Sequence, residues 1–212
     1  MKAQNKYFRQ FFYFFIWIFA TFLYLATNRI YPNSIDPAIF LDNYIPLIPW
    51  TAILYHLWYP SLIFLVIKMK NNPELEELLL KFAIAMSACF ITYKLIPAIV
   101  SVRPSIDGEK IFDIILRLTY YIDAPTSSLP SSHVVLALIA YHYAKKHNIK
   151  ILRYYEPVIL FVTLTTKQHV IADVLLGIIY ASVIIYSKKI DKLARFNTVS
   201  INFIYNKTIC YK

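Results

Sequence analysis

Residues 10–28 read QFFYFFIWIFATFLYLATN and contain no charged side chain. An uncharged apolar run of this length is what a helix needs to cross the hydrocarbon core of a bilayer. The run is too long for the core of a signal peptide and lacks a small-x-small cleavage site, so we expect it to remain in the protein as a helix. Blocks of similar composition recur along the chain, and together they decide the fold class.

These apolar blocks predict an all-α fold, a polytopic membrane helical bundle with about six transmembrane helices. Of the 212 residues, 58% are hydrophobic and 16% are charged, whereas roughly a quarter of the residues in an average soluble domain are charged. The fourth and fifth blocks are short and interrupted by polar residues, and either could be a buried soluble helix if taken alone. The expected spans lie near 10–28, 48–67, 78–100, 132–146, 152–168 and 170–187.

The chain length suits one domain, which we expect over 1–187, followed by a basic cytoplasmic tail over 188–212. Lysine and arginine gather in alternate connections between the blocks. By the positive-inside rule, this places both termini of a multi-pass cell-membrane protein in the cytoplasm. The connections 29–47, 101–131 and 167–170 then face outward.

The formal net charge of +10 therefore reflects topology, together with attraction to anionic lipid headgroups. No basic stripe alternates with exposed aromatic residues, so no nucleic acid partner is expected. Cys89 and Cys210 are too far apart in the sequence to indicate a disulfide framework or a metal site. The sequence predicts no metal and no other cofactor, and it leaves the oligomeric state open.

A small set of polar residues is not explained by helix ends or by side chains that reach the membrane surface. On the topology above, all of them lie toward the outward side. Ionisable groups at such a depth are energetically costly and are functional candidates by default. The set consists of Lys94, Arg103, Ser131, Ser132, His133, Lys167, His169 and Asp173.

The first cluster of this set lies in SSLPSSHVVLAL, residues 127–138. A helix that begins at Ser131 or Ser132 directs free backbone N–H groups outward, which makes its start a ready anion site. His133 could donate a hydrogen bond to a phosphate, or a proton to a leaving oxygen. The alternative is a serine N-cap followed by an interfacial histidine.

The second cluster is TKQHVIAD, residues 166–173. His169 and Asp173 are four residues apart, which places both side chains on one face of a helix. The carboxylate could hold one imidazole nitrogen and leave the other as a nucleophile or base. The alternative is a buried His–Asp hydrogen bond that only joins two helices.

The third cluster is YKLIPAIVSVRP, residues 93–104. Lys94 and Arg103 suggest a phosphate clamp, because arginine offers a bidentate fork and lysine a point charge. The alternative places Lys94 at the membrane surface and leaves Arg103 as an ordinary loop charge. Two histidines, an acid, two cations and a helix start are thus expected on one side of the membrane.

KLIPAIVSVRP, LPSSH and HVIAD, in this order over residues 94–177, resemble the three signature blocks of the type 2 phosphatidic acid phosphatase superfamily. That superfamily contains metal-independent lipid phosphatases and phosphotransferases, and its six-span layout is similar. The resemblance implies that His169 attacks phosphorus to form a phosphohistidine, that Asp173 orients it and that His133 protonates the leaving group. It also implies that the amides of Ser131 and Ser132, with Lys94 and Arg103, hold the phosphoryl oxygens.

The chain departs from the family pattern at three positions. Lys94 precedes Arg103 by nine residues, where the family usually has seven, and Ser132 replaces a glycine. If that glycine position needs a positive φ, serine carries a cost. Thr163 replaces an arginine, and Lys167 is the candidate source of the missing charge. Loss of that arginine resembles the branch of the inositol-phosphorylceramide and sphingomyelin synthases, which transfer a phosphoryl-headgroup to a lipid alcohol.

The sequence thus favours a membrane phosphatase acting on a lipid phosphate or pyrophosphate, such as phosphatidic acid or an isoprenyl pyrophosphate, at the outward face. One alternative is a phosphotransferase with a lipid or sugar hydroxyl as acceptor, and another is a non-catalytic phospholipid-binding protein. The expected partners are the lipid phosphate and the bilayer. The amphipathic stretch KIFDIILRLTYYID, residues 110–123, is expected to lie along the membrane surface as a lid or to pack as an ordinary helix.

Overall fold

The computed structural model describes residues 2–28 and 34–194, and within these ranges the chain is helical and forms no β-sheet. The predicted all-α fold is confirmed. Residues 195–212, most of the expected basic tail, lie outside the described residues. The helices are α1 (Lys2–Thr27), the 3₁₀ segment η1 (Phe40–Tyr44), α2 (Thr51–Lys68), α3 (Leu75–Leu95), α4 (Ile111–Ile122), α5 (Ser132–Lys146), α6 (Lys150–Tyr155), α7 (Val158–Thr165) and α8 (Ile171–Ile185).

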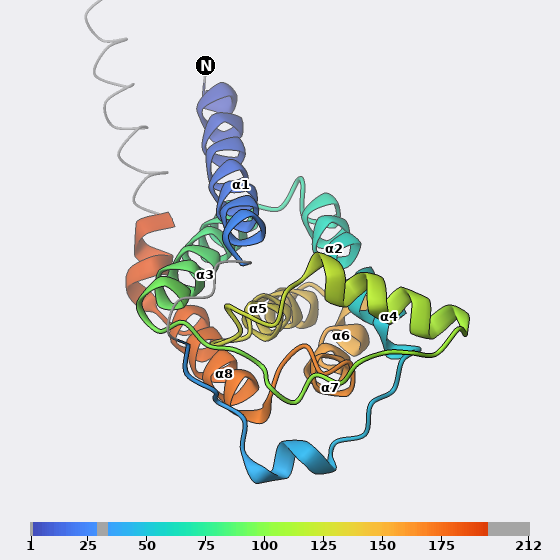
Figure 1. Ribbon diagram of the computed structural model, residues 1–212. Helices are drawn as coiled ribbons and strands as arrows, with labels where there is room; N and C mark the ends of the chain where they lie inside the picture. Colours follow the sequence, from blue (N-terminus) through green and yellow to red (C-terminus); the bar gives the residue numbers. More distant parts are fainter. Residues whose placement is uncertain (1, 29–33, 195–212) are drawn as a thin grey trace, which may run out of the picture.

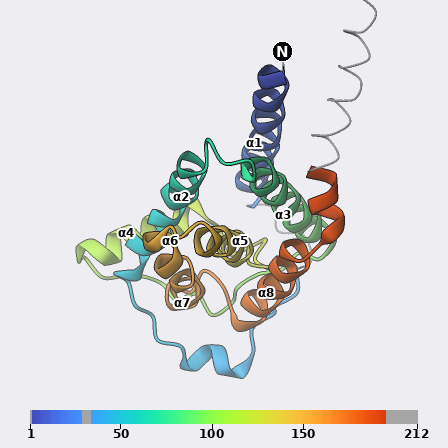
Figure 2. The same cartoon turned by 180° about the vertical axis from the view of Figure 1, so that it is seen from behind.

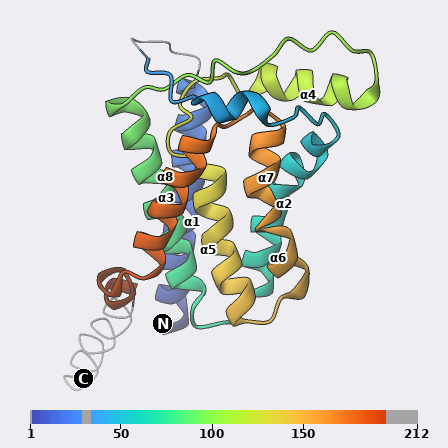
Figure 3. The same ribbon diagram turned by 90° about the horizontal axis from the view of Figure 1, so that it is seen from below.

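Helix α5 occupies the centre of the bundle and packs against α2, α3, α6, α7 and α8 (Figures 1 and 2). Ten of its 15 residues are buried, and only Lys145 and Lys146 at its end are exposed. Helix α1 packs mainly against α3. Seen from the side, α4 lies across one end of the bundle and η1 lies at the same end, while the start of α1 and the α2–α3 and α5–α6 connections lie at the other (Figure 3).

Every block predicted as a span contains a helix, although the third block, 78–100, is helical only to Leu95. Six spans are not confirmed. By length and composition, three helices could cross a membrane, namely α1, α2 and α3, or four if α8 and the bent segment Lys188–Ala194 form one span. Helix α5 has 15 residues and is about 22 Å long, which is shorter than the roughly 30 Å hydrocarbon core. The block 152–168 is divided at Glu156 and Pro157 into α6 and α7.

Ion pairs join the helices at the end of the bundle that carries the start of α1. Arg9 of α1 binds Glu76 of α3, with 2.7 Å between Nε and Oε1. Lys81 is 1% exposed, and its Nζ lies 3.1 Å from Glu77 Oε1 and 2.8 Å from Asp191 Oδ1. These contacts tie α1, α3 and the Lys188–Ala194 segment together at the end of the bundle opposite α4.

Lys81→Met is expected to destabilise the protein by about 3 kcal/mol, because it removes the buried partner of two partly buried carboxylates and leaves them uncompensated. The unfolding midpoint in detergent, followed by circular dichroism, measures the effect. Lys188→Met removes an exposed lysine nearby and serves as the control. Equal midpoints for the two variants would contradict a stabilising role for the Lys81 pairs.

Candidate active site

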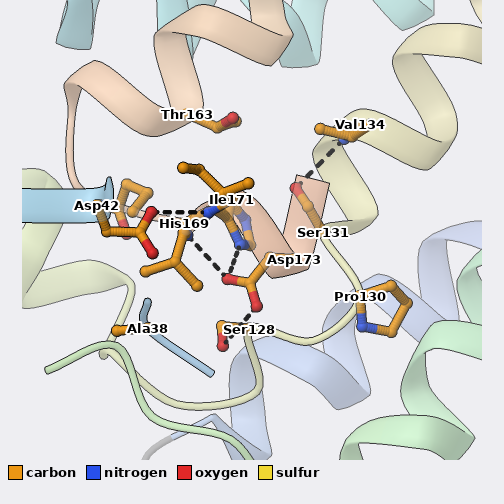
Figure 4. Close-up of polar contacts among 12 residues, drawn as sticks. Ala38, Asp42, Ser128, Pro130, Ser131, Val134, Thr163, His169, Ile171 and Asp173 are labelled. Atoms are coloured by element: carbon orange, nitrogen blue, oxygen red, sulfur yellow. Dashed lines mark hydrogen bonds and ion pairs between the residues drawn. The ribbon is translucent and has the colours of Figure 1, made fainter. Parts of the chain in front are cut away.

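His169 and Asp173 form a buried pair at the start of α8, as the sequence predicts (Figure 4). His169 Nδ1 lies 3.1 Å from Asp173 Oδ2, which also accepts the Val170 N–H at 3.2 Å. Ser128 Oγ donates to the other carboxylate oxygen at 3.4 Å. Because Nδ1 is engaged by Asp173, Nε2 is the nitrogen of His169 that remains available for chemistry.

The turn between α7 and α8 fixes the backbone of His169. The carbonyl of Thr163 accepts the N–H groups of Gln168 and His169, each at 3.1 Å. Thr163 is fully buried, and its hydroxyl donates to the Leu160 carbonyl at 3.0 Å. The residue at the position of the family's arginine therefore holds the turn through its backbone and brings no charge.

His133 faces His169 from the second residue of α5, and their ring centroids are 5.7 Å apart. The His133 ring lies against Tyr55 and Trp58 of α2, with centroids 4.4 Å and 4.3 Å away. His133 is 2% exposed, yet neither of its ring nitrogens has a hydrogen-bond partner. Buried polar atoms are nearly always bonded, so these nitrogens point to a group that the site receives.

The serines before His133 bring the starts of α5 and α8 together. Ser131 caps α5, its Oγ accepting the Val134 N–H at 3.4 Å, and its own N–H donates to the Asp173 carbonyl at 3.1 Å. Ser132 is buried and is not among the described residues with positive φ, so it carries no left-handed strain in place of the family's glycine. Two helix starts, each with partial positive charge, thus lie side by side.

Gly177 permits this close approach of α8 to α5. A Cβ at residue 177 would lie 3.1 Å from the Ser131 carbonyl oxygen and 3.1 Å from Val134 Cβ. Both neighbours belong to the first turn of α5, so a larger residue has to move one helix start relative to the other.

If His133 and His169 act together on one substrate, Gly177→Ala is expected to reduce kcat about tenfold, because displacing one histidine from the other by a fraction of an ångström weakens their alignment. Steady-state turnover measures the effect. Leu175→Ala, which truncates an exposed side chain on the same helix, is the control and should retain activity. Full activity in the Gly177 variant would show that the helix starts tolerate separation.

Arg103 reaches the site along an extended segment after α3. Residues 97–100 bond to the backbone of Ile35 and of residues 125–127, which redirects the chain. The Arg103 guanidinium donates to Gln168 Oε1 and, at 2.7 Å, to the Asp123 carbonyl. It lies 4.5 Å from the centroid of the Tyr120 ring. Burial raises the pKa of Tyr120 to about 12, although Arg103 lowers it, so the ring stays a neutral phenol at pH 7.

Lys94 and Lys167, two expected phosphate ligands, are directed elsewhere. Lys94 is exposed and its Nζ lies over the Phe90 ring, 5.4 Å from the centroid. Neighbouring helix residues point about 100° apart, so Tyr93 faces the interior instead and donates to the Pro130 carbonyl at 2.7 Å. Lys167 Nζ donates to the Asp42 carbonyl at 2.7 Å.

Sequence reasoning missed two buried aspartates that support the site. Asp42 in η1 accepts the Ile171 N–H at 2.8 Å, at the start of α8 (Figure 4). Asp123 accepts the hydroxyls of Tyr24 at 2.6 Å and Tyr55 at 2.9 Å. The available signal was the scarcity of acidic residues, 12 in the whole chain, which makes an aspartate in an outward connection unusual.

A largely apolar, partly open pocket adjoins His133. It lies between α1, α2, α3 and α5, and His133 and Ser132 form part of its wall. The rest of the wall is mostly aromatic and aliphatic, including Trp17, Tyr59 and Leu62. Such a lining suits a hydrocarbon chain whose polar end lies toward His133.

Three further buried polar atoms without partners belong to Arg103 and to the segments before His133 and His169. They are Arg103 Nε, Gln168 Nε2 and Thr126 Oγ1. Within residues 2–28 and 34–194, no group of three or more His, Cys, Asp or Glu side chains is arranged to hold a metal ion.

Comparison with protein-family models, curated proteins and solved structures finds no match for this chain.

Proposed function

We propose that this protein is an integral-membrane, metal-independent phosphatase that hydrolyses a lipid phosphate or pyrophosphate through a phosphohistidine intermediate. The observation that carries the proposal is the pairing of His169, held by Asp173, with a buried His133 whose ring nitrogens have no partner. This arrangement suits a nucleophile and a proton donor on the two sides of one phosphoryl group.

In the first half-reaction, His169 Nε2 attacks phosphorus and forms the N–P bond. The bond from phosphorus to the leaving oxygen breaks, and His133 gives that oxygen a proton. Asp173 holds the Nδ1–H of His169 and stabilises the positive charge that develops on the ring. Arg103 and the Ser132 backbone amide bind the phosphoryl oxygens. The Ser131 N–H, another expected ligand, donates to the Asp173 carbonyl instead.

In the second half-reaction, water attacks phosphorus while His133, now neutral, accepts its proton. The N–P bond breaks, inorganic phosphate leaves, and His169 returns to its neutral form. The proton that left with the first product is thereby replaced, and both histidines recover their starting states.

The lipid nature of the substrate is supported by the cavity beside His133. Its apolar wall suits an acyl or isoprenoid chain, while the phosphate lies between the two histidines. We place this end of the bundle at the outward face of the cell membrane and both chain termini in the cytoplasm, because the basic connections lie at the opposite end (Figure 3).

A phosphotransferase is the second candidate, and the charge at the site favours it. Of the three expected cationic ligands, Arg103 binds Gln168, the residue before His169, whereas Lys94 lies over the Phe90 ring and Lys167 binds the Asp42 carbonyl. A single guanidinium suits a singly charged phosphodiester, whose headgroup could pass to a lipid or sugar hydroxyl in place of water.

Phosphate release by the purified protein in detergent, from phosphatidic acid, an isoprenyl pyrophosphate and a glycerophospholipid, tests the proposal. Release from a phosphomonoester or pyrophosphate that continues in EDTA is the expected result. Loss of activity in EDTA that a metal restores would contradict the metal-free mechanism. Headgroup transfer to a lipid alcohol without phosphate release would establish the transferase. Absence of both phosphate release and headgroup transfer would indicate a non-catalytic phospholipid-binding protein.

A further inference from the structure

The 3₁₀ segment η1 has two sides of opposite character. Its large apolar side chains are exposed: Phe40 is 72% exposed, Leu41 58% and Tyr44 69%. Phe40 and Tyr44 contact each other edge to face, with ring centroids 5.0 Å apart. Asp42, between them in the sequence, is 1% exposed. The segment therefore directs its hydrophobic side chains away from the protein and its carboxylate into it.

Segment η1 extends beyond the bundle rather than covering it. Viewed along the bundle axis, it lies outside the ring of helices, beyond α7 and α8 (Figure 1). Viewed from the side, it lies at the level of the outer ends of those helices (Figure 3). Helix α8 also exposes apolar residues spaced four apart, Leu175, Ile179 and Val183. They face lipid if α8 lies in the membrane.

The inner side of η1 holds the turn that carries His169. Asp42 Oδ1 accepts the Ile171 N–H at 2.8 Å, and the Asp42 carbonyl accepts Lys167 Nζ at 2.7 Å. These two contacts lie on either side of His169 in the sequence. The chain after η1 adds a third contact, from the Ile48 N–H to the Thr165 carbonyl at 2.9 Å.

The backbone of this turn is strained at Lys167, whose φ is 53°. A non-glycine residue in the left-handed region persists only where its surroundings fix it. Both Asp42 contacts supply such fixation, because one binds the Lys167 side chain and the other the first amide of α8. Segment η1 is therefore bonded to the turn on both sides of His169.

We propose that η1 binds the phospholipid surface at the outward face of the membrane and that this contact holds the His169 turn through Asp42. Phe40, Leu41 and Tyr44 enter the headgroup region, where aromatic side chains concentrate in membrane proteins. In detergent or without lipid contact, η1 is less restrained and the turn loosens. The lipid contact stands by itself, whereas its effect on catalysis rests on the proposed function.

Fluorescence quenching by lipid tests the contact. Leu41→Cys, labelled with an environment-sensitive dye in phosphatidylcholine vesicles, is expected to be quenched by spin-labelled phospholipid. Ser105→Cys, in an exposed loop at the same end of the bundle, is the control, and its dye should not be quenched. Cys210→Ser removes the tail cysteine from both, and Cys89 is fully buried. Equal quenching at both sites, or efficient cross-linking of two copies through the cysteine introduced by Leu41→Cys, would overturn the proposal.

Hydrogen exchange tests the coupling without any activity assay. The triple variant Phe40→Ser, Leu41→Ser, Tyr44→Ser keeps Asp42 but removes the apolar side. In vesicles, it is expected to speed amide exchange at residues 167–171 about tenfold, as Asp42→Asn also should. Exposed apolar side chains of α4, replaced in Ile111→Ser and Tyr121→Ser, provide the matched control, which should leave this exchange unchanged. Unchanged exchange in the η1 triple variant would overturn the coupling even if the protein proves to be no phosphatase.

Discussion

The substitution His169→Ala is expected to lower phosphate release by about 10⁴-fold or more, because loss of a covalent nucleophile removes the first half-reaction. His169 is the histidine whose Nδ1 is held by a carboxylate, 3.1 Å from Asp173 Oδ2, which leaves Nε2 for attack. The measurement is a single-turnover reaction with a ³²P-labelled lipid phosphate, followed by alkaline denaturation and a test of whether the protein-bound label is lost in acid. The wild-type protein should carry the acid-sensitive label and His169→Ala should not.

His142→Ala is the matched control for this experiment. His142 also lies on a helix of the bundle core but in the later turns of α5, far along the helix from His133. It should retain both phosphate release and the labelled intermediate. Protein-bound label in His169→Ala would contradict a phosphohistidine at residue 169. So would the absence of this label from the wild-type protein during active turnover.

The substitution Asp173→Asn is expected to lower kcat by about 10³- to 10⁴-fold. An amide cannot hold the His169 imidazole in the required tautomer or stabilise its positive charge. Asp173 is fully buried and accepts from both His169 and the Val170 N–H through one oxygen. An amide of the same shape keeps the packing, so KM should change little while kcat falls. Steady-state kinetics in detergent separates these two parameters.

Asp107→Asn, in an exposed loop, is the control for the loss of a carboxylate. The unfolding midpoint of Asp173→Asn should also be compared with that of the wild type, because Ser128 and Val170 bond to the same carboxylate. A rise in KM without a fall in kcat would indicate that Asp173 serves binding and not the orientation of His169.

The helices were largely predictable from the sequence, because lipid and core both select long apolar runs. The block 132–146 coincides with α5, and the amphipathic stretch 110–123 contains α4. The six-span count was not confirmed, because it rests on the length of each apolar block, and a break within a block shortens the helices that form there. Pro157 lacks a backbone donor, and with buried Glu156 beside it the fifth block became two helices.

The site was predictable where its members are close in sequence. The His169–Asp173 pair was predicted from a spacing of four residues on one helix, and the contact forms, although His169 lies in the turn before α8 and Asp173 in the first turn of that helix. Lys94 was misplaced because its direction depends on where α3 ends, which spacing does not show. Asp42 was not predicted as a site residue, because its bond to α8 joins residues 129 positions apart in the sequence. Such a tertiary contact leaves no local sequence pattern.

The central position of α5 also bears on how the protein enters the membrane. A helix that is surrounded by protein and exposes only its final lysines is not selected for solubility in hydrocarbon. It can therefore carry serine and histidine in its first turn, which an isolated span at the translocon would tolerate poorly. We expect that α5 is retained in the bilayer only once its neighbours have been synthesised. Biogenesis of the reactive centre then depends on helices encoded both before and after it.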